Sequence, residues 1–201
     1  MKPAPTETLE QVFDQISALW TGAVRDRRSP LHTPMVCSVA DDMPAPRIMV
    51  LREVAADIGR FRFHTDVRSP KADQIAHGAP LAILAYDPEA RIQLTVRGTG
   101  RIERSGETVE QAWSAAAPSS RRCYLAAHAP GTPLDSCTSG IPENLLDRAP
   151  SLQESEAGRG NFGVLLIEAR ELEWLKLTSC GNRRAAFHRS GEDWHGHWIA
   201  P

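Results

Sequence analysis

The stretch RIQLTVRGTGRIE, residues 91–103, decides the fold class of this chain. Within it, the apolar Ile92 and Leu94 alternate with the polar Gln93 and Thr95. A period of two is that of a strand with one face packed on a core and the other turned toward water or a ligand. Such strands are typical of antiparallel sheets, so the stretch predicts an antiparallel sheet with one buried and one open side.

Further strands are expected on both sides of this one. Each candidate is short, rich in β-branched or aromatic residues or strictly alternating, and bounded by turn-forming residues. They cover residues 35–40, 46–54, 59–65, 79–87, 161–177 and 192–201, with hairpin turns around 40–46 and 55–60.

Helices are expected only at the periphery of the sheet. Residues 7–24 carry apolar side chains at a spacing of three and four, and Thr8 with Gln11 matches a capping box. Residues 106–117 and 119–128 are predicted as two helices separated by a proline. The fold class is therefore mainly β (α+β), an antiparallel barrel or sandwich with peripheral helices.

The length of 201 residues suits one domain with a sizeable core, so residues 1–201 are expected to form a single domain. Residues 129–160 are rich in proline, glycine, serine and acidic residues, which predicts a long and partly mobile surface loop.

Charge and composition exclude several classes of function. The net charge of −2 gives no basic field for nucleic acid or an anionic membrane, so neither is expected as a partner. The longest apolar run is too short to cross a bilayer, and the N-terminus lacks a hydrophobic signal region, which predicts a cytoplasmic protein. The four cysteines show no paired spacing, which argues against a zinc site or a disulfide framework.

The segment FHTDVRSPKADQI, residues 63–75, predicts a strand that turns directly into a helix. Arg68, Ser69 and Lys71 lie at this joint, where two cations beside a helix start attract an anion such as a phosphate. The alternative is a serine that caps the helix among solvated charges, which is common in proteins.

Other polar residues are informative only in combination. Arg47 begins a strand after a proline, and an arginine there can hold a phosphate bidentately or be a surface charge. Arg183 and Arg184 are adjacent, as in many solvated turns. His195 and His197 are two apart on one strand face, but no third ligand is evident and no metal is expected.

The order of these segments resembles that of the pyridoxamine 5′-phosphate oxidase-like flavoproteins. The matching pieces are PRIMVLREV, FRFHTDVRSPKADQI, APLAILAYD, RIQLTVRGTGRIE and a C-terminal NRRAAF…W…IAP. The resemblance covers the chain from about residue 30 to 201, except for 129–160. It implies a split β-barrel that forms a homodimer, with one FMN in each of two clefts between the subunits.

The resemblance also implies roles for individual residues. Arg47 matches an arginine on the FMN phosphate and ribityl chain. Lys71 matches a phosphate-binding lysine, with Arg68 and Ser69 beside it. The polar contact Thr132, in the expected loop, is a weaker match.

The remaining matches surround the flavin ring. They offer backbone atoms, hydrogen bonds at a strand end, an amide from the partner subunit and a cation near the ring. These residues are Ile48, Met49, Val50, His64, Thr65, Gln93 and Arg184. Arg183 is an alternative to Arg184.

The substrate half of the site departs from the oxidase pattern. Arg52 stands where the oxidases have a lysine that binds the substrate phosphate. Ala117 or Pro118 stands near the position of a helical arginine of the oxidases. Cys180 and Asn182 stand near the positions of an Arg–x–His pair of the oxidases, and Leu175 stands where the oxidases have a tryptophan.

The expected function is therefore that of an FMN-binding oxidoreductase with an altered substrate site. Three alternatives stay open: a flavin-binding or storage module without turnover, a relative using deazaflavin or haem, and a plain structural barrel.

Overall fold

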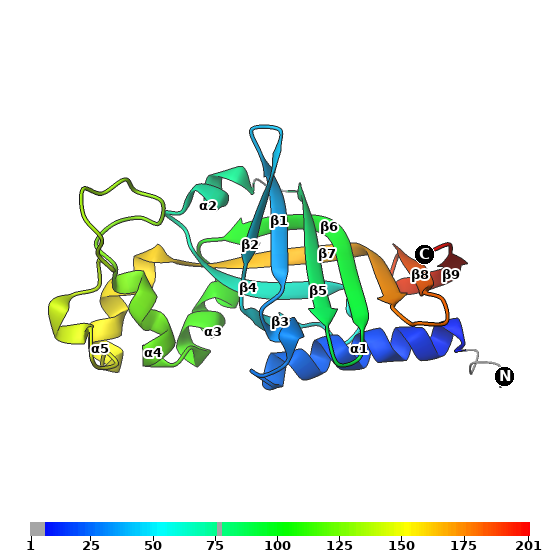
Figure 1. Ribbon diagram of the computed structural model, residues 1–201. Coiled ribbons are helices and arrows are strands. Elements are labelled where there is room, and N and C mark those ends of the chain that lie inside the picture. The colour runs from blue at the N-terminus through cyan, green and yellow to red at the C-terminus, as the bar shows by residue number, and fades with distance from the viewer. Residues whose placement is uncertain (1–6, 76–77) are drawn as a thin grey trace. The chain divides into compact units, whose positions relative to one another are not determined.

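The computed structural model describes residues 7–75 and 78–201, so residues 1–6 and 76–77 of the expected domain lie outside it. Its strands are β1 (Met35–Ala40), β2 (Met43–Ile48), β3 (Leu51–Val54), β4 (Arg60–Asp66), β5 (Ala79–Asp87), β6 (Ile92–Glu103), β7 (Phe162–Lys176), β8 (Arg183–Ser190) and β9 (Asp193–Ile199) (Figure 1). Its helices are α1 (Leu9–Arg25), α2 (Pro70–Gln74), α3 (Glu107–Ala115), α4 (Pro118–Arg121) and α5 (Leu152–Ser155), with 3-10 turns η1 (Pro30–His32), η2 (Arg122–Leu125), η3 (Glu143–Leu145) and η4 (Glu156–Asn161).

The strands form one antiparallel sheet in the order β2-β1-β5-β6-β7-β4-β3, with β8 added to β7 and β9 to β8. This confirms the expected fold class of an antiparallel sheet with peripheral helices. The described residues divide into two compact units. Unit 1 comprises residues 7–63, 78–100 and 166–201, and unit 2 comprises residues 64–75 and 101–165.

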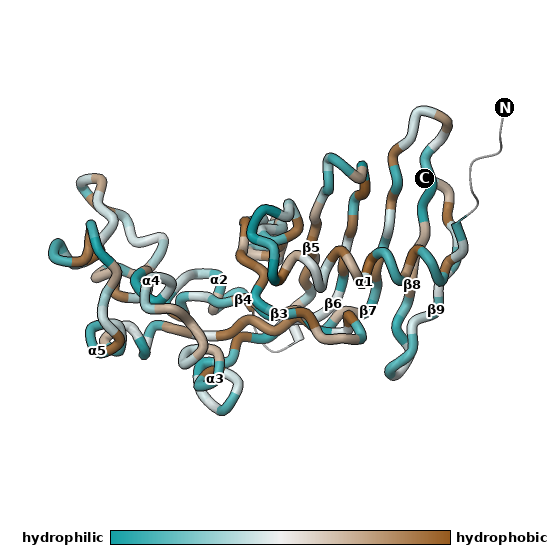
Figure 2. The backbone as a smooth tube through the Cα atoms, turned by 90° about the horizontal axis from the view of Figure 1, so that it is seen from below, coloured by the Kyte–Doolittle hydropathy of each residue, from teal (hydrophilic) through white to brown (hydrophobic). Residues whose placement is uncertain are grey.

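The core of unit 1 follows the alternation predicted from the sequence. Ile92 and Leu94 are buried, whereas Gln93 is half-buried on the opposite face of β6. The amphipathic helix α1 begins with the capping box of Thr8 and packs against β3 and β9. Apolar and polar residues alternate along α1, as Figure 2 shows, and its buried Trp20 meets Phe61 edge to face at 5.2 Å.

Two glycines of β6 allow a close approach of neighbouring strands in unit 1. A Cβ at Gly98 would lie 2.0 Å from the backbone oxygen of Glu168, and one at Gly100 would lie 2.1 Å from a Leu81 methyl group. The GTG of residues 98–100 therefore serves strand packing in this sheet.

Unit 2 has its own aromatic core. Phe162 lies 5.1 Å, centroid to centroid, from both Trp113 and Tyr124. The buried Arg121 donates to the carbonyls of Ala116 and Trp113 and pairs with Glu156. An arginine with so many partners joins α3, α4 and η4 into one body.

Three expectations about strands were wrong in detail. The expected strand 46–54 is two strands, because β2 ends at Ile48 in its pairing with β1, whereas Leu51–Val54 pair with β4 as β3; the Met49 amide still donates to the Pro34 carbonyl, at 3.1 Å. The turn expected at 40–46 is shorter, since Asp41 and Asp42 take the left-handed conformation, with φ of 50° and 60°. The arginines expected in a solvated turn begin β8.

The helices are shorter than expected, and α4 begins at Pro118. The segment 129–160, expected as a loop, contains η3, α5 and most of η4, and its mobility stays a prediction. No helix among the described residues is both long and apolar enough to span a membrane.

Candidate functional site

The predicted joint between a strand and a helix exists in unit 2. β4 ends at Asp66 and α2 begins at Pro70 with Ser69 as its N-cap residue. The Ser69 hydroxyl makes no cap hydrogen bond; it donates to the Asp66 carbonyl, at 2.6 Å, and accepts from the Lys71 ammonium, at 2.9 Å. Ser69 is 2% exposed, so it fixes the position of the lysine rather than lying in solvent.

Arg68 is tied to the joint by a bidentate pair with Asp66. Its Nε and Nη2 lie 3.0 and 2.7 Å from the two carboxylate oxygens, and its Nη1 donates to the Ala126 carbonyl, at 3.0 Å. The hydrogen bond that Arg68 donates to Asp66 raises the pKa of Arg68 above its ordinary value. In this structure Arg68 braces the turn that carries Lys71.

His64 and Thr65 lie in the same unit at the end of β4. The His64 ring meets Phe162 edge to face at 4.9 Å. The Thr65 side chain is 3% exposed, and its hydroxyl donates to the Asp66 carbonyl, at 3.3 Å.

Arg47 lies on β2 in unit 1. Its Nη1 donates to the Ser38 hydroxyl, at 2.8 Å, and Ser38 itself is buried. Burial lowers the pKa of Arg47 from its ordinary value, and the nearby Cys37 acts in the opposite sense. Because its partner Ser38 is neutral, the charge of this partly desolvated guanidinium is not neutralised by that hydrogen bond and can attract an anion.

The three residues after Arg47 differ in environment. Ile48 is 65% exposed and Met49 is 7% exposed. The Met49 amide already donates to the Pro34 carbonyl, so it is not available as one of the expected backbone contacts with the ring. Val50 lies between β2 and β3 and is half-buried.

Arg52 lies at a bulge of β3, where the register with β4 shifts between Leu51 and Glu53. Arg52 and Arg47 lie on different strands. The Arg52 Nε is buried and makes no hydrogen bond within the described part of the chain. A bulge re-aims a side chain, and a buried donor without an acceptor marks Arg52 as a candidate ligand contact.

Gln93 and Arg184 lie on the same face of the sheet. Gln93 and Arg97 share one face of β6, and Arg97 and Arg184 both bond the carboxylate of Glu173. Arg184 of β8 reaches Glu173 of β7 because these two strands are paired. The Gln93 carboxamide has no hydrogen-bond partner among residues 7–75 and 78–201 and is available to a ligand.

Glu173 lies between two arginines. Burial alone would raise its pKa, but hydrogen bonds from Arg184 and Arg97 outweigh it and lower the pKa below its ordinary value. Arg183 points away from this network, because adjacent residues of a strand face opposite sides; it pairs with Glu7 at 2.6 Å. The geometry thus favours Arg184 over Arg183 as a companion of Gln93.

Arg47 and Gln93 lie on opposite faces of the sheet in unit 1. Val36 is the cross-strand partner of both Arg47 and Ile83, and Ile83 pairs with Val96. Directly paired residues share a face, so Arg47 is on the face of Val96, and Gln93 is on the other.

The structure therefore gathers the candidates into separate groups. In unit 2 it brings together His64, Thr65, Arg68, Ser69 and Lys71. In unit 1 it brings Gln93 and Arg184 to one face and Arg47 to the other. Thr132 forms its own turn by donating to the Ala129 carbonyl, at 2.8 Å.

Sequence reasoning missed Ser38, Asp66 and Glu173, which hold the arginines named above. Asp66 is two residues before Arg68, and this spacing is a signal that could have been used. Glu173 is far from both its arginines in the sequence, so only the strand register reveals it. No group of three or more possible metal ligands is found within the described ranges.

Comparisons with known proteins also indicate a flavin-binding fold. Residues 17–104 match the family model of the pyridoxamine 5′-phosphate oxidase FMN-binding domain. The comparison with curated proteins finds no match.

Two solved structures resemble the chain over nearly its whole length. A pyridoxamine 5′-phosphate oxidase-related, FMN-binding protein of Nostoc punctiforme PCC 73102 is 22% identical, with 98% of this chain and 99% of that one covered and a TM-score of 0.70. PhzG of Burkholderia lata 383, solved with tetrahydrophenazine-1-carboxylic acid, is 16% identical, with 98% and 94% covered and a TM-score of 0.66. At these identities the likeness shows the fold, a split barrel.

The family model and the shared fold confirm the resemblance seen in the order of the sequence motifs. Residues 17–104 thus match the FMN-binding domain of the pyridoxamine 5′-phosphate oxidase family, which the whole chain resembles in fold.

Proposed function

We propose that the chain binds FMN and acts as an FMN-dependent oxidoreductase whose substrate site differs from that of pyridoxamine 5′-phosphate oxidases. One observation carries the proposal. Within the segment that matches an FMN-binding model, the Lys71 ammonium is held 2.9 Å from Ser69 Oγ at a turn braced by the Arg68–Asp66 pair. A fixed cation at a strand end is suited to a phosphate monoester.

The chemistry of the remaining donors fits the same ligand. Arg47 is a guanidinium bonded to a neutral hydroxyl, and it would neutralise a second phosphate oxygen. Gln93 offers a carboxamide without a partner in the described chain, which would pair with the polar edge of a flavin ring. The buried Nε of Arg52 has no acceptor among the described residues, and a substrate would supply one.

Two copies of the chain would share each FMN. Arg47 and Gln93 of one chain face opposite sides of the sheet, so one planar ligand lying on one face meets only one of them. In a homodimer, Arg47 of one protomer and Gln93 of its partner would face the same ligand.

When bound, FMN supplies the redox chemistry, accepting a hydride from the substrate and passing electrons to an acceptor. Lys71 and Arg47 would bind the phosphate, and Gln93 would orient the ring. Arg184 would place positive charge at the ring, moderated by its pair with Glu173. No side chain here is assigned as a general base, and hydride transfer does not require one.

The test is to release the chromophore from the purified protein and identify it by mass, after recording its absorbance. FMN with flavin absorbance supports the proposal. A deazaflavin, a haem Soret band or no chromophore after incubation with FMN contradicts it. Reduction of bound flavin by NADH, NADPH or a small amine then tests the oxidoreductase activity.

A flavin-binding module without turnover is the second candidate. The turn at Cys180 and Asn182, where an oxidase has Arg–x–His, satisfies its own polar groups. The Asn182 side chain accepts from the Thr178 amide, at 3.2 Å, and the Thr178 hydroxyl donates to the Gly181 carbonyl. FMN binding without steady-state reduction by any of these donors would favour this candidate.

A further inference from the structure

A pocket of about 430 Å³ lies in unit 1 between the start of α1 and the β8–β9 hairpin. Its lining residues are Leu9, Glu10, Phe13, Asp57, Phe187, Glu192, Asp193, Trp194 and Gly196. None of these residues was a candidate for the flavin, and the volume is that of a small-molecule site.

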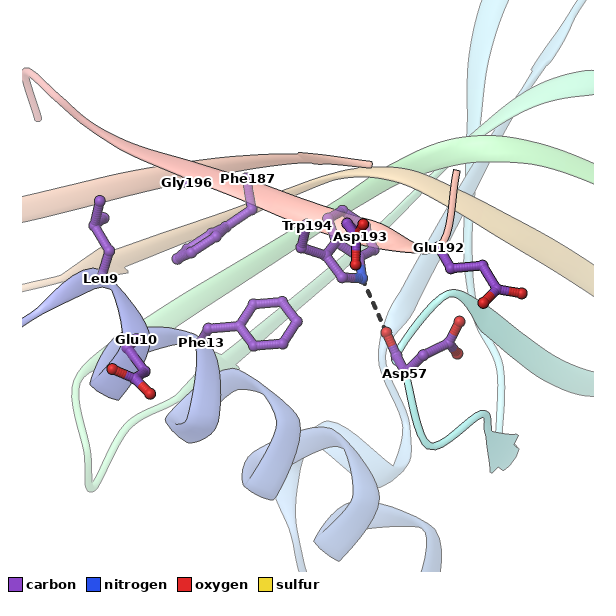
Figure 3. Close-up of a pocket in the computed structure, with 9 residues that line it drawn as sticks. All are labelled: Leu9, Glu10, Phe13, Asp57, Phe187, Glu192, Asp193, Trp194 and Gly196. Carbon is purple, nitrogen blue, oxygen red and sulfur yellow. Dashed lines mark hydrogen bonds between the residues drawn. The ribbon is translucent and has the colours of Figure 1, made fainter. Parts of the chain in front are cut away.

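The middle of the pocket is aromatic. The rings of Phe13 and Phe187 lie 5.4 Å apart, and Trp194 lies 6.1 Å from Phe13. Figure 3 shows these rings between Leu9 and Glu10 on one side and Asp57 and Glu192 on the other. Such rings give an organic ligand apolar contact area and faces that attract a cation.

The rim of the pocket is acidic. Four of its nine lining residues are Asp or Glu, and none is Lys, Arg or His. Asp57 is compensated, because its carboxylate pairs with Arg189 and its backbone carbonyl accepts from Trp194 Nε1, at 2.9 Å. Glu10, Glu192 and Asp193 make no ion pair within residues 7–75 and 78–201.

The Trp194 ring already lies beside one cation of the chain. The guanidinium carbon of Arg189 lies 6.0 Å from the centroid of the Trp194 ring. The hydrogen bond to Asp57 fixes the indole, so the ring is a rigid wall of the pocket. Three uncompensated carboxylates around fixed aromatic rings repel an anion and favour a positive charge on an apolar body.

We propose that this pocket binds a small organic cation, a primary ammonium on an aromatic or branched apolar group. The apolar group lies against Phe13, Phe187 and Trp194, and the ammonium pairs with Glu192 and Asp193 at the rim. A phosphorylated ligand such as FMN is unsuited to this lining, so the site is chemically separate from the proposed flavin residues.

The experiment titrates the full chain with three probes that share a phenylethyl group: cationic 2-phenylethylamine, neutral 2-phenylethanol and anionic 3-phenylpropionate. Calorimetry or NMR shift changes give each Kd at low ionic strength and neutral pH. The expected result is saturable binding of the amine, with the alcohol about tenfold weaker and no binding of the carboxylate.

A pair of double variants assigns the binding to this pocket. Glu192→Gln/Asp193→Asn removes two rim charges, whereas Asp14→Asn/Glu89→Gln removes two exposed charges of unit 1 that do not line the pocket. The first is expected to weaken amine binding about tenfold, and the second to leave it within about twofold. Melting curves and retained flavin report whether both variants are folded.

Three outcomes overturn the proposal. The first is equal affinity for the alcohol and the amine, which would make the pocket merely apolar. The second is an equal effect of the two double variants. The third is failure of the amine to saturate the wild-type protein, including the case where sedimentation shows that a second copy of the chain covers the pocket. None of these outcomes bears on FMN binding, which is measured independently by chromophore content.

Discussion

Arg47 and Gln93 lie on opposite faces of one sheet, and this relationship makes the proposed FMN site testable as a shared one. If the two residues act on one FMN, they come from different protomers. A site built within one protomer would place both on the same chain. The two arrangements predict different behaviour when defective subunits are mixed.

We expect Arg47→Ala and Gln93→Ala each to weaken FMN retention, and a mixture of the two variants, unfolded and refolded together, to regain part of it. Random assembly makes about half of the dimers mixed, each with one intact site, so about a quarter of all sites recover. FMN content per chain, measured at a flavin concentration that neither variant alone retains, is the readout. Recovery no greater than the average of the separate variants contradicts the shared site.

Lys71 carries the phosphate assignment. Lys71→Ala removes the ammonium that Ser69 positions, and the loss of a hydrogen bond to a charged group is expected to weaken FMN binding about tenfold to a hundredfold. The control is Arg27→Ala, which removes an exposed charge from the turn after α1. Flavin titration followed by fluorescence gives both dissociation constants. Equal constants for Lys71→Ala and the wild type would remove Lys71 from the site.

Variants of Arg68 distinguish two roles: holding the turn in place through Asp66, and binding the phosphate directly. Its guanidinium bonds both Asp66 oxygens, a geometry that a lysine ammonium cannot reproduce. We therefore expect Arg68→Lys to lower FMN retention and the melting temperature about as much as Arg68→Ala does. Arg60→Lys, at an exposed position of β4, is the matched control and is expected to change neither. Full retention of FMN by Arg68→Lys would mean that only the positive charge matters.

The sequence predicted the elements whose pattern is local. The alternation of residues 91–103 gave β6, and the spacing in 7–24 with Thr8 gave α1. It missed β8 as a strand because RRAAFHRS has no β-branched residue, and the burial of Ala185 and Phe187 follows from its neighbours in the sheet. Tertiary context, absent from the local pattern, decides such strands.

The same distinction holds for the candidate site. The joint at Ser69 and Lys71 is local, and its turn was predicted from the residues themselves. The carboxylate of Glu173, in contrast, meets Arg97 and Arg184 only because β6, β7 and β8 are neighbours in a particular register. Long-range pairs of this kind require the strand order, which the composition of each strand does not contain.

The carboxylate of Glu173 gives a prediction about stability and pH. Hydrogen bonds from the two arginines outweigh burial and hold its pKa below the ordinary value. Folding therefore favours its ionised form, so its stabilisation is present above the unfolded pKa, about 4, and is lost as pH falls through the lower folded pKa. Glu173→Gln is expected to reduce the free energy of unfolding by about 1 to 2 kcal/mol at pH 7.

The difference in free energy of unfolding between Glu173→Gln and the wild type should narrow as pH falls from about 5 toward 3, because the unfolded wild-type chain then binds a proton at Glu173 that the folded chain binds only at lower pH. Urea unfolding curves across this range measure it. Glu171→Gln is the matched control on the same strand, since Glu171 is 42% exposed and lies 3.5 Å from Arg97. It is expected to change stability by less than about 0.5 kcal/mol. A deficit of Glu173→Gln that stays constant down to pH 3 would show that packing, and not the ionised carboxylate, stabilises this face of the sheet.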